Sequence, residues 1–500
     1  MRIFLSLLLL PTLSAQPVPS SAPSLAPSLA KPLTDQKPVV RDQEITIQGK
    51  VLKYKSTTGM MPLKTEAGEV EAQLFYVAYT VEGPNRPLTI CFNGGPGAGS
   101  LWLHLGAIGP HRAMMNDDGS LPPAPYKMSP NESTWLEKSD LVFVDPVGTG
   151  FSRARNAEVG RKYFGVRGDI ESVGTFVRQY LNQTKRWQSP LYIAGESYGT
   201  TRAAGLSQWL VDHGIALNGV MLISTIMNFQ TVRFQRGNDV AYATHLPTYT
   251  AIAWYHKKLP ADLQKDLRKA VDESRKFASG EYQQLLYKGD ALTPEERKRG
   301  IDRLARLTGL SRDFLDHSEL RVEIQRFTKE LLRDRGLTVG RLDGRLTGHE
   351  GSATAETPTF DPSMSAIRPP YTAIMNQYAR EQLGWEDEKE YFALGGGITA
   401  PWDWGITQNG GQGFADTSEN LRAALERNPH MKVFIATGYY DLATPFHAVE
   451  YTVSHMGLTP ALRKNLRWSE YEAGHMMYIH VPSLKKLKVD VDSFYDDSLR

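Results

Sequence analysis

The sequence predicts an α/β protein in which helices cover both faces of a mostly parallel sheet. Short apolar runs alternate with amphipathic stretches in two parts of the chain, which is typical of βαβ units. The runs are apolar throughout rather than at every second residue, and this indicates strands that are buried on both faces. With 500 residues, 41% of them hydrophobic and 22% charged, the chain has the length and composition of a globular protein with a large core.

The first forty residues are predicted to lie outside this core. Residues 1–15 combine Arg2 with an apolar run that is far too short to span a bilayer, so we expect a signal peptide rather than the alternative, a buried N-terminal helix. Residues 16–40 are rich in proline, serine and alanine and predict an extended tether. Cys91 is the only cysteine, so no intramolecular disulfide is possible. This favours an exported bacterial protein, periplasmic or secreted.

The rest of the chain is expected to form an α/β domain, residues 41–230 and 400–500, interrupted by a mainly helical cap insertion, residues 231–399. Alternation from about residue 44 to 82 predicts antiparallel strands at one side of the sheet. Further strands are predicted in LTICF, LVFVD, LYIAG, VMLIST and KVFIATG, and helices in SVGTFVRQYLNQ, TRAAGLSQWLVDHG and NLRAALERNP. In the insertion, TPEERKRGIDRLARL opens on a capping box and RLDGRL predicts a tight hairpin.

Charge and motif content exclude several classes of function. A net charge of +2 gives no reason to expect nucleic acid or an anionic membrane as a partner. The chain contains no C-x-x-C, no H-E-x-x-H and no phosphate-binding glycine loop. We therefore expect no metal and no organic cofactor.

Ser197 lies between two glycines in YIAGESYGTT, after a predicted strand and before a predicted helix. This context holds a nucleophilic serine on a sharp turn, although G-x-S-x-G alone also fits a simple bend. A serine nucleophile needs a histidine base and an acid that orients it. Asp441 and His475 follow beyond apolar runs in the order of α/β-hydrolases, with Asp416 and His480 as rivals. We predict an α/β-hydrolase fold with Ser197, Asp441 and His475 as the triad.

An oxyanion hole requires two backbone N–H donors directed at the developing negative charge. Tyr198, the residue after the nucleophile, is expected to supply one donor. The segment CFNGGPGAGS follows a predicted strand, and its glycines allow a close backbone approach. Gly95 in this segment is the expected second donor.

Five segments together resemble the serine carboxypeptidase family of peptidases: NGGPG (93–97), VDPVGTGFS (144–152), GESYG (195–199), DLATP (441–445) and GHM (474–476). They occur in the family's order with similar spacing, whereas the insertion resembles the family only in position. The resemblance implies release of the C-terminal residue from a peptide with a free C-terminus, through an acyl-enzyme and with an acidic pH optimum. It implies the same triad and oxyanion hole.

The resemblance also implies that Asn93 and Glu196 bind the free α-carboxylate of the substrate. Two carboxylates at hydrogen-bond distance must share a proton, because both cannot stay charged without a large cost. Substrate binding should therefore weaken as Glu196 ionises. The alternative for Glu196 is a solvent-exposed residue of the turn.

Two positions depart from the family pattern. Cys91 stands where the family usually has a tryptophan, and Ala107 where it commonly has a glutamate that pairs with the glutamate of GESYG. Half of the carboxylate clamp is thus missing, with His104, His111 and Arg112 as residues that would have to compensate. An esterase or acyltransferase with the same triad is therefore the alternative function. An inactive binding module is disfavoured because no triad member is lost.

Overall fold

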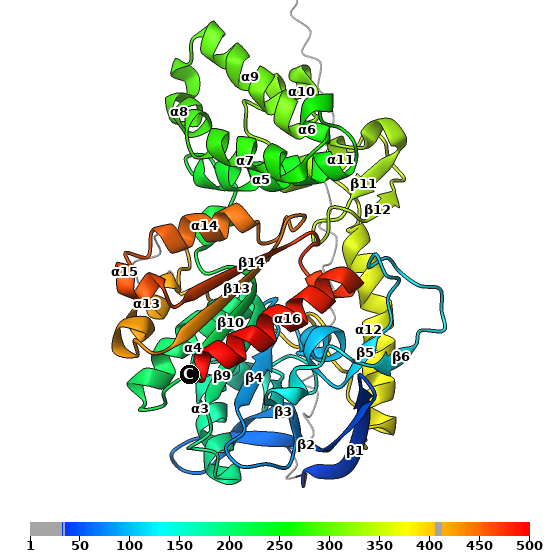
Figure 1. Ribbon diagram of the computed structural model, residues 1–500, viewed down its shortest axis with the longest axis vertical. Coiled ribbons are helices and arrows are strands. Elements are labelled where there is room, and N and C mark those ends of the chain that lie inside the picture. Colours follow the sequence, from blue (N-terminus) through cyan, green and yellow to red (C-terminus); the bar gives the residue numbers. More distant parts are fainter. Residues whose placement is uncertain (1–32, 34–35, 406–412) are drawn as a thin grey trace, which may run out of the picture. The chain divides into compact units, whose positions relative to one another are not determined.

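The computed structural model describes Leu33, residues 36–405 and residues 413–500. The predicted signal peptide and most of the predicted tether, up to residue 32, lie outside the described residues. Residues 33–500 form one compact unit that contains a ten-stranded sheet (Figure 1). Within the described ranges, no helix is both long and apolar enough to cross a membrane.

The sheet has an antiparallel side and a parallel side, as the sequence predicts. Strands β1, β2, β3 and β7 pair antiparallel in that order, and β7, β4, β9, β10, β13 and β14 continue the sheet in parallel. The strands are β1 (Val39–Ile47), β2 (Lys50–Lys64), β3 (Val70–Thr80), β4 (Leu88–Phe92), β7 (Asp140–Val144), β9 (Leu191–Ser197), β10 (Gly219–Thr225), β13 (Lys432–Gly438) and β14 (Leu466–Tyr471). The tenth strand, β8 (Arg153–Ala154), pairs antiparallel with β3. All residues of β4, β7 and β10 are buried, which explains why their sequences are apolar without alternation.

Helices pack on both faces of the parallel strands, which confirms the α/β-hydrolase architecture. Helices α3 (Val166–Thr184), α4 (Tyr198–Asp212) and α13 (Ser418–Arg427) bury apolar side chains against one face. On the other face lie α12 (Pro362–Glu381) and α16 (Val481–Ser498) (Figure 1). The carboxyl ends of β4, β9, β13 and β14 therefore meet at one edge, where a parallel sheet carries its site.

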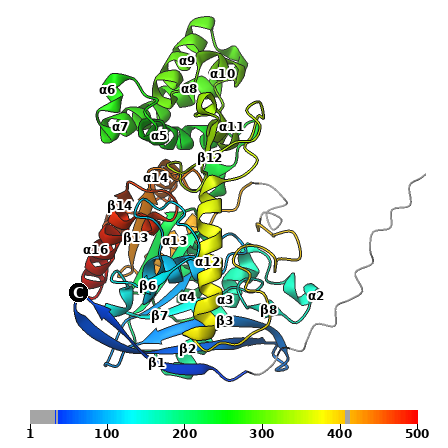
Figure 2. The same cartoon turned by 90° about the vertical axis from the view of Figure 1, so that its right-hand side faces the viewer.

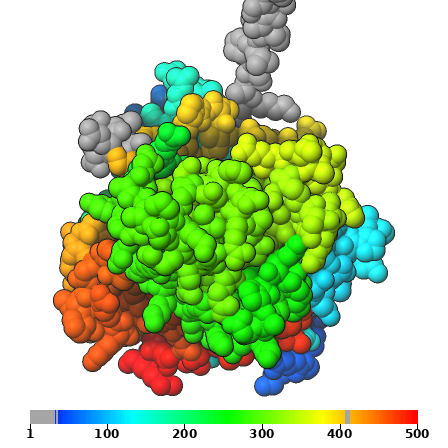
Figure 3. Space-filling model, turned by 90° about the horizontal axis from the view of Figure 1, so that it is seen from above, coloured from blue at the N-terminus to red at the C-terminus, as the bar shows by residue number. Residues whose placement is uncertain are grey.

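Most of the chain between β10 and β13 is helical, as predicted. The helices include α5 (Val240–Tyr255), α6 (Ala261–Gln264), α7 (Leu267–Ala278), α8 (Glu281–Lys288), α9 (Pro294–Thr308), α10 (Arg312–His317) and α11 (Ile324–Glu330). They enclose an apolar cluster of their own and form most of the face seen in Figure 3. Helix α9 begins with the predicted capping box, in which Thr293 and Glu296 each bond the other's backbone N–H.

The last part of the predicted insertion packs into the main core. Helix α12 runs alongside the sheet (Figure 2), and its buried side chains belong to the same apolar cluster as α16. Trp385 and Tyr391, which follow α12, are also buried in this cluster. The exact division between catalytic domain and cap stays a prediction.

The tight hairpin predicted for RLDGRL is wrong. Strands β11 (Leu337–Val339) and β12 (Thr347–His349) do pair antiparallel, but the whole of residues 340–346 forms the loop between them. The backbone of this loop makes contacts outside itself, because Gly344 N–H donates to the carbonyl of Tyr440 at 2.9 Å. The wider loop reaches the ends of β13 and β14.

Candidate active site

Ser197 is the last residue of β9 and has a strained backbone, with φ 61° and ψ −133°. The turn is held by Thr200, whose hydroxyl donates to the Ser197 carbonyl at 2.7 Å. Glycine is required at Gly199 for close packing, since a Cβ there would lie 3.0 Å from the carbonyl oxygen of Asn93. Residues other than glycine rarely adopt a positive φ such as that of Ser197, and backbone strain of this kind clusters at functional sites. The predicted strand–turn–helix context of Ser197 is therefore present.

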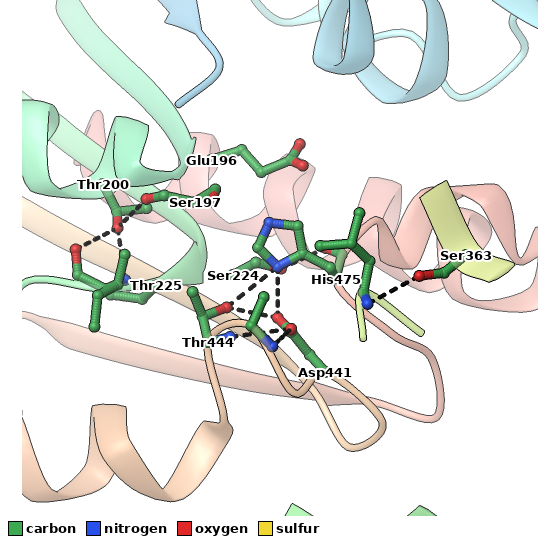
Figure 4. A network of polar contacts seen from close by, with 12 residues as sticks. Glu196, Ser197, Thr200, Ser224, Thr225, Ser363, Asp441, Thr444 and His475 are labelled. Atoms are coloured by element: carbon green, nitrogen blue, oxygen red, sulfur yellow. Dashed lines mark hydrogen bonds and ion pairs between the residues drawn. The ribbon is translucent and has the colours of Figure 1, made fainter. Parts of the chain in front are cut away.

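His475 and Asp441 form a buried pair next to Ser197. The Nδ1 atom of His475 lies 2.7 Å from Oδ2 of Asp441, and Figure 4 shows the imidazole between Asp441 and Ser197. The other carboxylate oxygen of Asp441 accepts the N–H groups of Ala443 at 2.8 Å and Thr444 at 3.0 Å. The Asp441 carboxylate is thus fixed in position and orients the ring of His475.

The pair stabilises its own charged forms. Burial alone would lower the pKa of His475, but the carboxylate of Asp441 outweighs it and the pKa of His475 is raised. Burial would likewise raise the pKa of Asp441, yet the charge and hydrogen bond of His475 and the hydrogen bonds of Thr444 hold it below its ordinary value. Asp441 therefore stabilises an imidazolium, as a base that accepts a proton requires.

The two rival residues lie elsewhere. Asp416 accepts the N–H of Ser418 at 2.8 Å just before α13, which is a capping contact. His480 Nδ1 lies 2.8 Å from the hydroxyl of Ser483 at the start of α16. Neither lines the cavity that contains Ser197 and His475.

That cavity has a volume of about 120 Å³. It is lined by Ser197 and His475 of the predicted triad, by Gly95 of the predicted oxyanion hole, and by Glu196 and Asn93, which are predicted to bind the substrate carboxylate. Its apolar wall is formed by Ala98, Trp102, Leu342, Met364, Ile367, Leu394, Ala443 and Met476. A small pocket with apolar walls and a few convergent polar groups is typical of a ligand site.

Gly95 and Tyr198, whose N–H groups are the predicted oxyanion donors, belong to two different elements next to Ser197. Gly95 belongs to the loop after β4, and Tyr198 is the first residue of α4, so its N–H has no acceptor within the helix. At Gly94 a Cβ would lie only 2.5 Å from the Tyr198 nitrogen and 2.8 Å from the Glu196 carbonyl. There is no room for a side chain at Gly94, because the loop after β4 packs closely on the turn at Ser197.

Replacing Gly94 by alanine is expected to lower kcat by about 10²- to 10³-fold, the typical cost of losing one oxyanion donor. The added methyl group must push the loop away from the Tyr198 N–H. Steady-state kinetics on the folded variant, checked by circular dichroism, measures this effect. Gly351→Ala is the matched control, because a Cβ at Gly351 meets nothing within 4 Å. A folded Gly94→Ala enzyme with the wild-type kcat would contradict the oxyanion role.

Glu196 is buried, with 3% of its surface exposed, so the alternative of a solvent-exposed residue is wrong. One of its carboxylate oxygens accepts hydrogen bonds from Asn93 Nδ2 at 3.2 Å and from the Tyr478 hydroxyl at 2.5 Å. Burial raises the pKa of Glu196 to about 7, against the lowering effect of the His475 charge and of these two hydrogen bonds. Glu196 therefore holds a proton at acidic pH.

Tyr478 was not among the residues singled out in the sequence. Its ring packs directly on Gly106, the residue before Ala107, where an added Cβ would overlap the ring. The tyrosine thus supplies a hydroxyl to Glu196 from a different part of the chain than Ala107, the position where the family commonly has a glutamate. His104 does not compensate, since it stacks on Phe143 at 4.1 Å and burial lowers its pKa to about 3. No short sequence pattern links Tyr478 to Glu196, which lies almost three hundred residues earlier.

A buried ion pair between Arg202 and Asp169 contacts the residues around the site. Arg202 Nε lies 2.8 Å from Oδ2 of Asp169, and both side chains are almost fully buried. Arg202 Nη1 also donates to the Asn93 carbonyl at 2.6 Å, and the guanidinium lies 5.4 Å from the ring centroid of Tyr198. Arg202 thus couples the loop after β4 to the start of α4.

The loop 340–346 contacts the histidine directly. The N–H of His475 donates to the carbonyl of Leu342 at 2.6 Å. A Cβ on Gly474 would lie 2.5 Å from this carbonyl oxygen and from Asp343. A side chain at Gly474 would therefore collide with the loop 340–346, which packs there.

Comparison with known proteins gives consistent matches. The chain is 33% identical to serine carboxypeptidase-like 51 of Arabidopsis thaliana over 142 residues. This alignment covers 27% of each of the two chains. It is 37% identical over 112 residues to the pheromone-processing carboxypeptidase KEX1 of Saccharomyces cerevisiae, or 21% of this chain and 14% of that protein. With the retinoid-inducible serine carboxypeptidase of Rattus norvegicus, it shares 30% identity over 149 residues, 27% of this chain and 29% of the other. These alignments span less than a third of each relative's length.

Among solved structures, the comparison with VinJ aligns 88% of this chain with 98% of the VinJ chain, at 13% sequence identity. The TM-score of 0.39 is too low for any argument about function. The family model described as serine carboxypeptidase matches residues 47–488, from the first strand of the sheet to the last helix. The chain belongs to the serine carboxypeptidase family.

Proposed function

We propose that the protein is a serine carboxypeptidase that removes C-terminal residues from peptides. The observation that carries this proposal is one cavity in which Ser197 and His475 lie beside the buried Glu196. The first two are the groups that cleave an acyl bond, and the third is a proton-bearing carboxyl that suits a carboxylate ligand. Family membership over most of the chain supports the same function.

In the first half-reaction, His475 removes the proton of the Ser197 hydroxyl, and Oγ attacks the carbonyl carbon of the last peptide bond. The N–H groups of Gly95 and Tyr198 stabilise the negative oxygen of the tetrahedral intermediate. The C–N bond then breaks, and His475 gives its proton to the departing amino group. The acyl part stays on Ser197 as an ester, and the C-terminal residue leaves as a free amino acid.

In the second half-reaction, His475 removes a proton from water, and the hydroxide attacks the same carbonyl carbon. The ester bond to Ser197 breaks, Oγ takes back the proton from His475, and the shortened peptide leaves. Asp441 keeps the ring in the orientation that both steps need. Water balances the reaction, so no further reactant is required.

Glu196 is the proposed receptor of the substrate's α-carboxylate, with Asn93 and Tyr478 as its partners. The protonated carboxyl group donates a hydrogen bond to the carboxylate, whereas the ionised form repels it. The pKa of Glu196 is about 7 in the free protein. Substrate binding is therefore strongest well below pH 7 and is lost as the pH rises through about 7, which places the optimum on the acidic side.

The acidic limit follows from His475. Its pKa is raised, and the base must be neutral to accept a proton, so kcat falls as the pH drops below that pKa. Glu196 and His475 also affect each other's charge, so the measured pKa values belong to the pair. A bell-shaped profile in kcat/KM is expected.

The test compares a blocked dipeptide with a free C-terminus, its C-terminal amide and its methyl ester from pH 3 to 8. The free acid should be preferred at acidic pH, with a preference that fades as the pH rises through about 7. In Glu196→Gln the side chain cannot ionise, so the rise of KM for the free acid between pH 6 and 8 should disappear. Equal cleavage of acid and amide at every pH would reject the carboxylate site, and ester cleavage alone would favour an esterase.

We also propose export of the protein to a bacterial periplasm or the medium. The support is the sequence of residues 1–15, which lie outside the described residues, and the presence of a single cysteine. Cys91 is buried, so it is not available for an intermolecular disulfide.

A further inference from the structure

Two arginines, one lining the proposed catalytic cavity and one packed near Tyr198, have no acidic partner among the residues that the structure describes. Arg341, in the loop between β11 and β12, lines the cavity together with Ser197. Arg233 lies over the ring of Trp404, with 5.1 Å between the guanidinium carbon and the ring centroid. Within the ranges that the structure describes, neither guanidinium group takes part in an ion pair. By contrast, Arg345 of the same loop pairs with an aspartate at 2.6 Å.

The backbone of Arg341 is fixed relative to the catalytic groups. Its N–H donates to Asp361 Oδ1 at 3.1 Å, and its carbonyl accepts the N–H of Leu442, the residue after the triad aspartate, at 3.1 Å. The next carbonyl, that of Leu342, accepts the N–H of His475. The Arg341 side chain therefore starts from a position that is tied to both the acid loop and the base loop.

Arg233 is placed by an aromatic platform beside the nucleophile. Trp404 packs edge-on against Tyr198, with 6.0 Å between ring centroids, and Phe229 lies 4.7 Å from Trp404. The guanidinium of Arg233 lies over Phe229 as well as Trp404. Arg233 is thus linked through Trp404 to Tyr198, the residue that directly follows Ser197.

The two positive charges are close enough to interact. Burial and, after it, the charge of Arg341 lower the pKa of Arg233. The acid that contacts the Arg341 backbone, Asp361, already accepts hydrogen bonds from the N–H and the hydroxyl of Ser363. Residues 406–412, which follow Trp404 in the sequence, contain no acidic side chain. Both arginines are nevertheless solvent-exposed and therefore available to an anion, and a carboxylate bound by them would gain charge-assisted hydrogen bonds.

The direction of the bound peptide determines which carboxylate this is. If Glu196 binds the C-terminal carboxylate, the departing residue lies on the Glu196 side of Ser197. The residue that becomes the acyl group then lies away from Glu196. Arg341 lines the cavity that contains Ser197, and Arg233 packs on the aromatic cluster that contacts Tyr198. We propose that Arg233 and Arg341 bind the side-chain carboxylate of an aspartate or glutamate directly before the scissile bond. This inference rests on the proposed function and adds a substrate class to it.

The test compares two blocked dipeptides, Glu-Phe and Gln-Phe, at pH 6. At this pH the substrate glutamate is ionised, since its ordinary pKa is about 4.3, while most Glu196 is protonated. We expect wild-type kcat/KM to be about tenfold higher for the Glu substrate, as is typical of a hydrogen bond to a charged group. In the double variant Arg233→Gln/Arg341→Gln this ratio should fall to about one. Arg178→Gln, an exposed arginine of α3, is the control and should keep the wild-type ratio.

The outcomes separate this proposal from the proposed function. A wild-type enzyme that cleaves both dipeptides equally, or a double variant that keeps the tenfold preference, overturns the acidic subsite and leaves the carboxypeptidase function standing. An equal loss on both substrates in the variant leaves the ratio unchanged, and overturns it in the same way. Failure of the wild type to cleave either dipeptide overturns the proposed function itself.

A charge reversal gives an independent readout. In Arg341→Glu the cavity gains a carboxylate where it had a guanidinium, so a blocked Lys-Phe dipeptide should be preferred over Gln-Phe. The ratio of kcat/KM for these two substrates is expected to rise above the wild-type ratio. A variant that is folded, cleaves Gln-Phe and shows the wild-type Lys-to-Gln ratio would overturn the placement of Arg341 beside the substrate side chain.

Discussion

Ser197→Ala is expected to lower kcat/KM for a blocked dipeptide by about 10⁵- to 10⁶-fold, because the variant has no oxygen to form the acyl-enzyme. The remaining activity would come from the oxyanion hole and from substrate positioning alone. The wild-type protein should also be labelled once per chain by a phosphonofluoridate, and the variant not at all. Mass spectrometry of the labelled peptide and steady-state kinetics measure the two effects.

Ser279→Ala is the control for Ser197→Ala. Ser279 is an exposed residue at the end of α7, and its hydroxyl donates only to a carbonyl of the same helix. This variant should retain wild-type activity and labelling. If Ser197→Ala kept more than a hundredth of the wild-type activity, Ser197 would not be the nucleophile.

Asp441→Asn is expected to lower kcat by about 10⁴-fold. One oxygen of Asp441 accepts two backbone N–H groups, from Ala443 and Thr444, so the amide oxygen of an asparagine would take that place. The NH₂ group would then face Nδ1 of His475 and donate to it. This forces the ring proton onto Nε2, the nitrogen that must accept the proton of Ser197.

The rival aspartate provides the matched control for this experiment. Asp416→Asn changes a capping contact before α13 and should leave kcat within a few-fold of the wild-type value. Both variants should stay folded, which thermal unfolding checks, because asparagine preserves the shape of the side chain. A kcat of Asp441→Asn within tenfold of the wild type would contradict the orienting role of Asp441.

Much of the fold was predictable because burial on both faces leaves a strong signal. Strands such as β4 and β7 are apolar at every position, and α3 and α13 show helical spacing of buried residues. The loop between β11 and β12 was not predictable in this way. Its conformation depends on contacts with Tyr440 and His475, which lie more than ninety residues further along the chain.

The residues of the candidate site likewise differ in whether the sequence could identify them. Ser197 and Asp441 could be named because each lies at or just beyond the end of an apolar strand, and His475 because it comes after them in the order of α/β-hydrolases. Tyr478 could not be named, because its contact with Glu196 depends on the packing of its ring against Gly106. The same holds for Arg233 and Arg341, whose placement beside the cavity follows from loops outside the regular strands and helices.

The most direct test of the account is product analysis by mass spectrometry. A hexapeptide with a blocked N-terminus and a free C-terminus is incubated with the protein at pH 6.5, and with Ser197→Ala in parallel. The account predicts a series of products shortened one residue at a time from the C-terminus, seen only with the wild type, while the C-terminally amidated peptide is cleaved far more slowly. Internal cleavage, or no shortening that depends on Ser197, would contradict it.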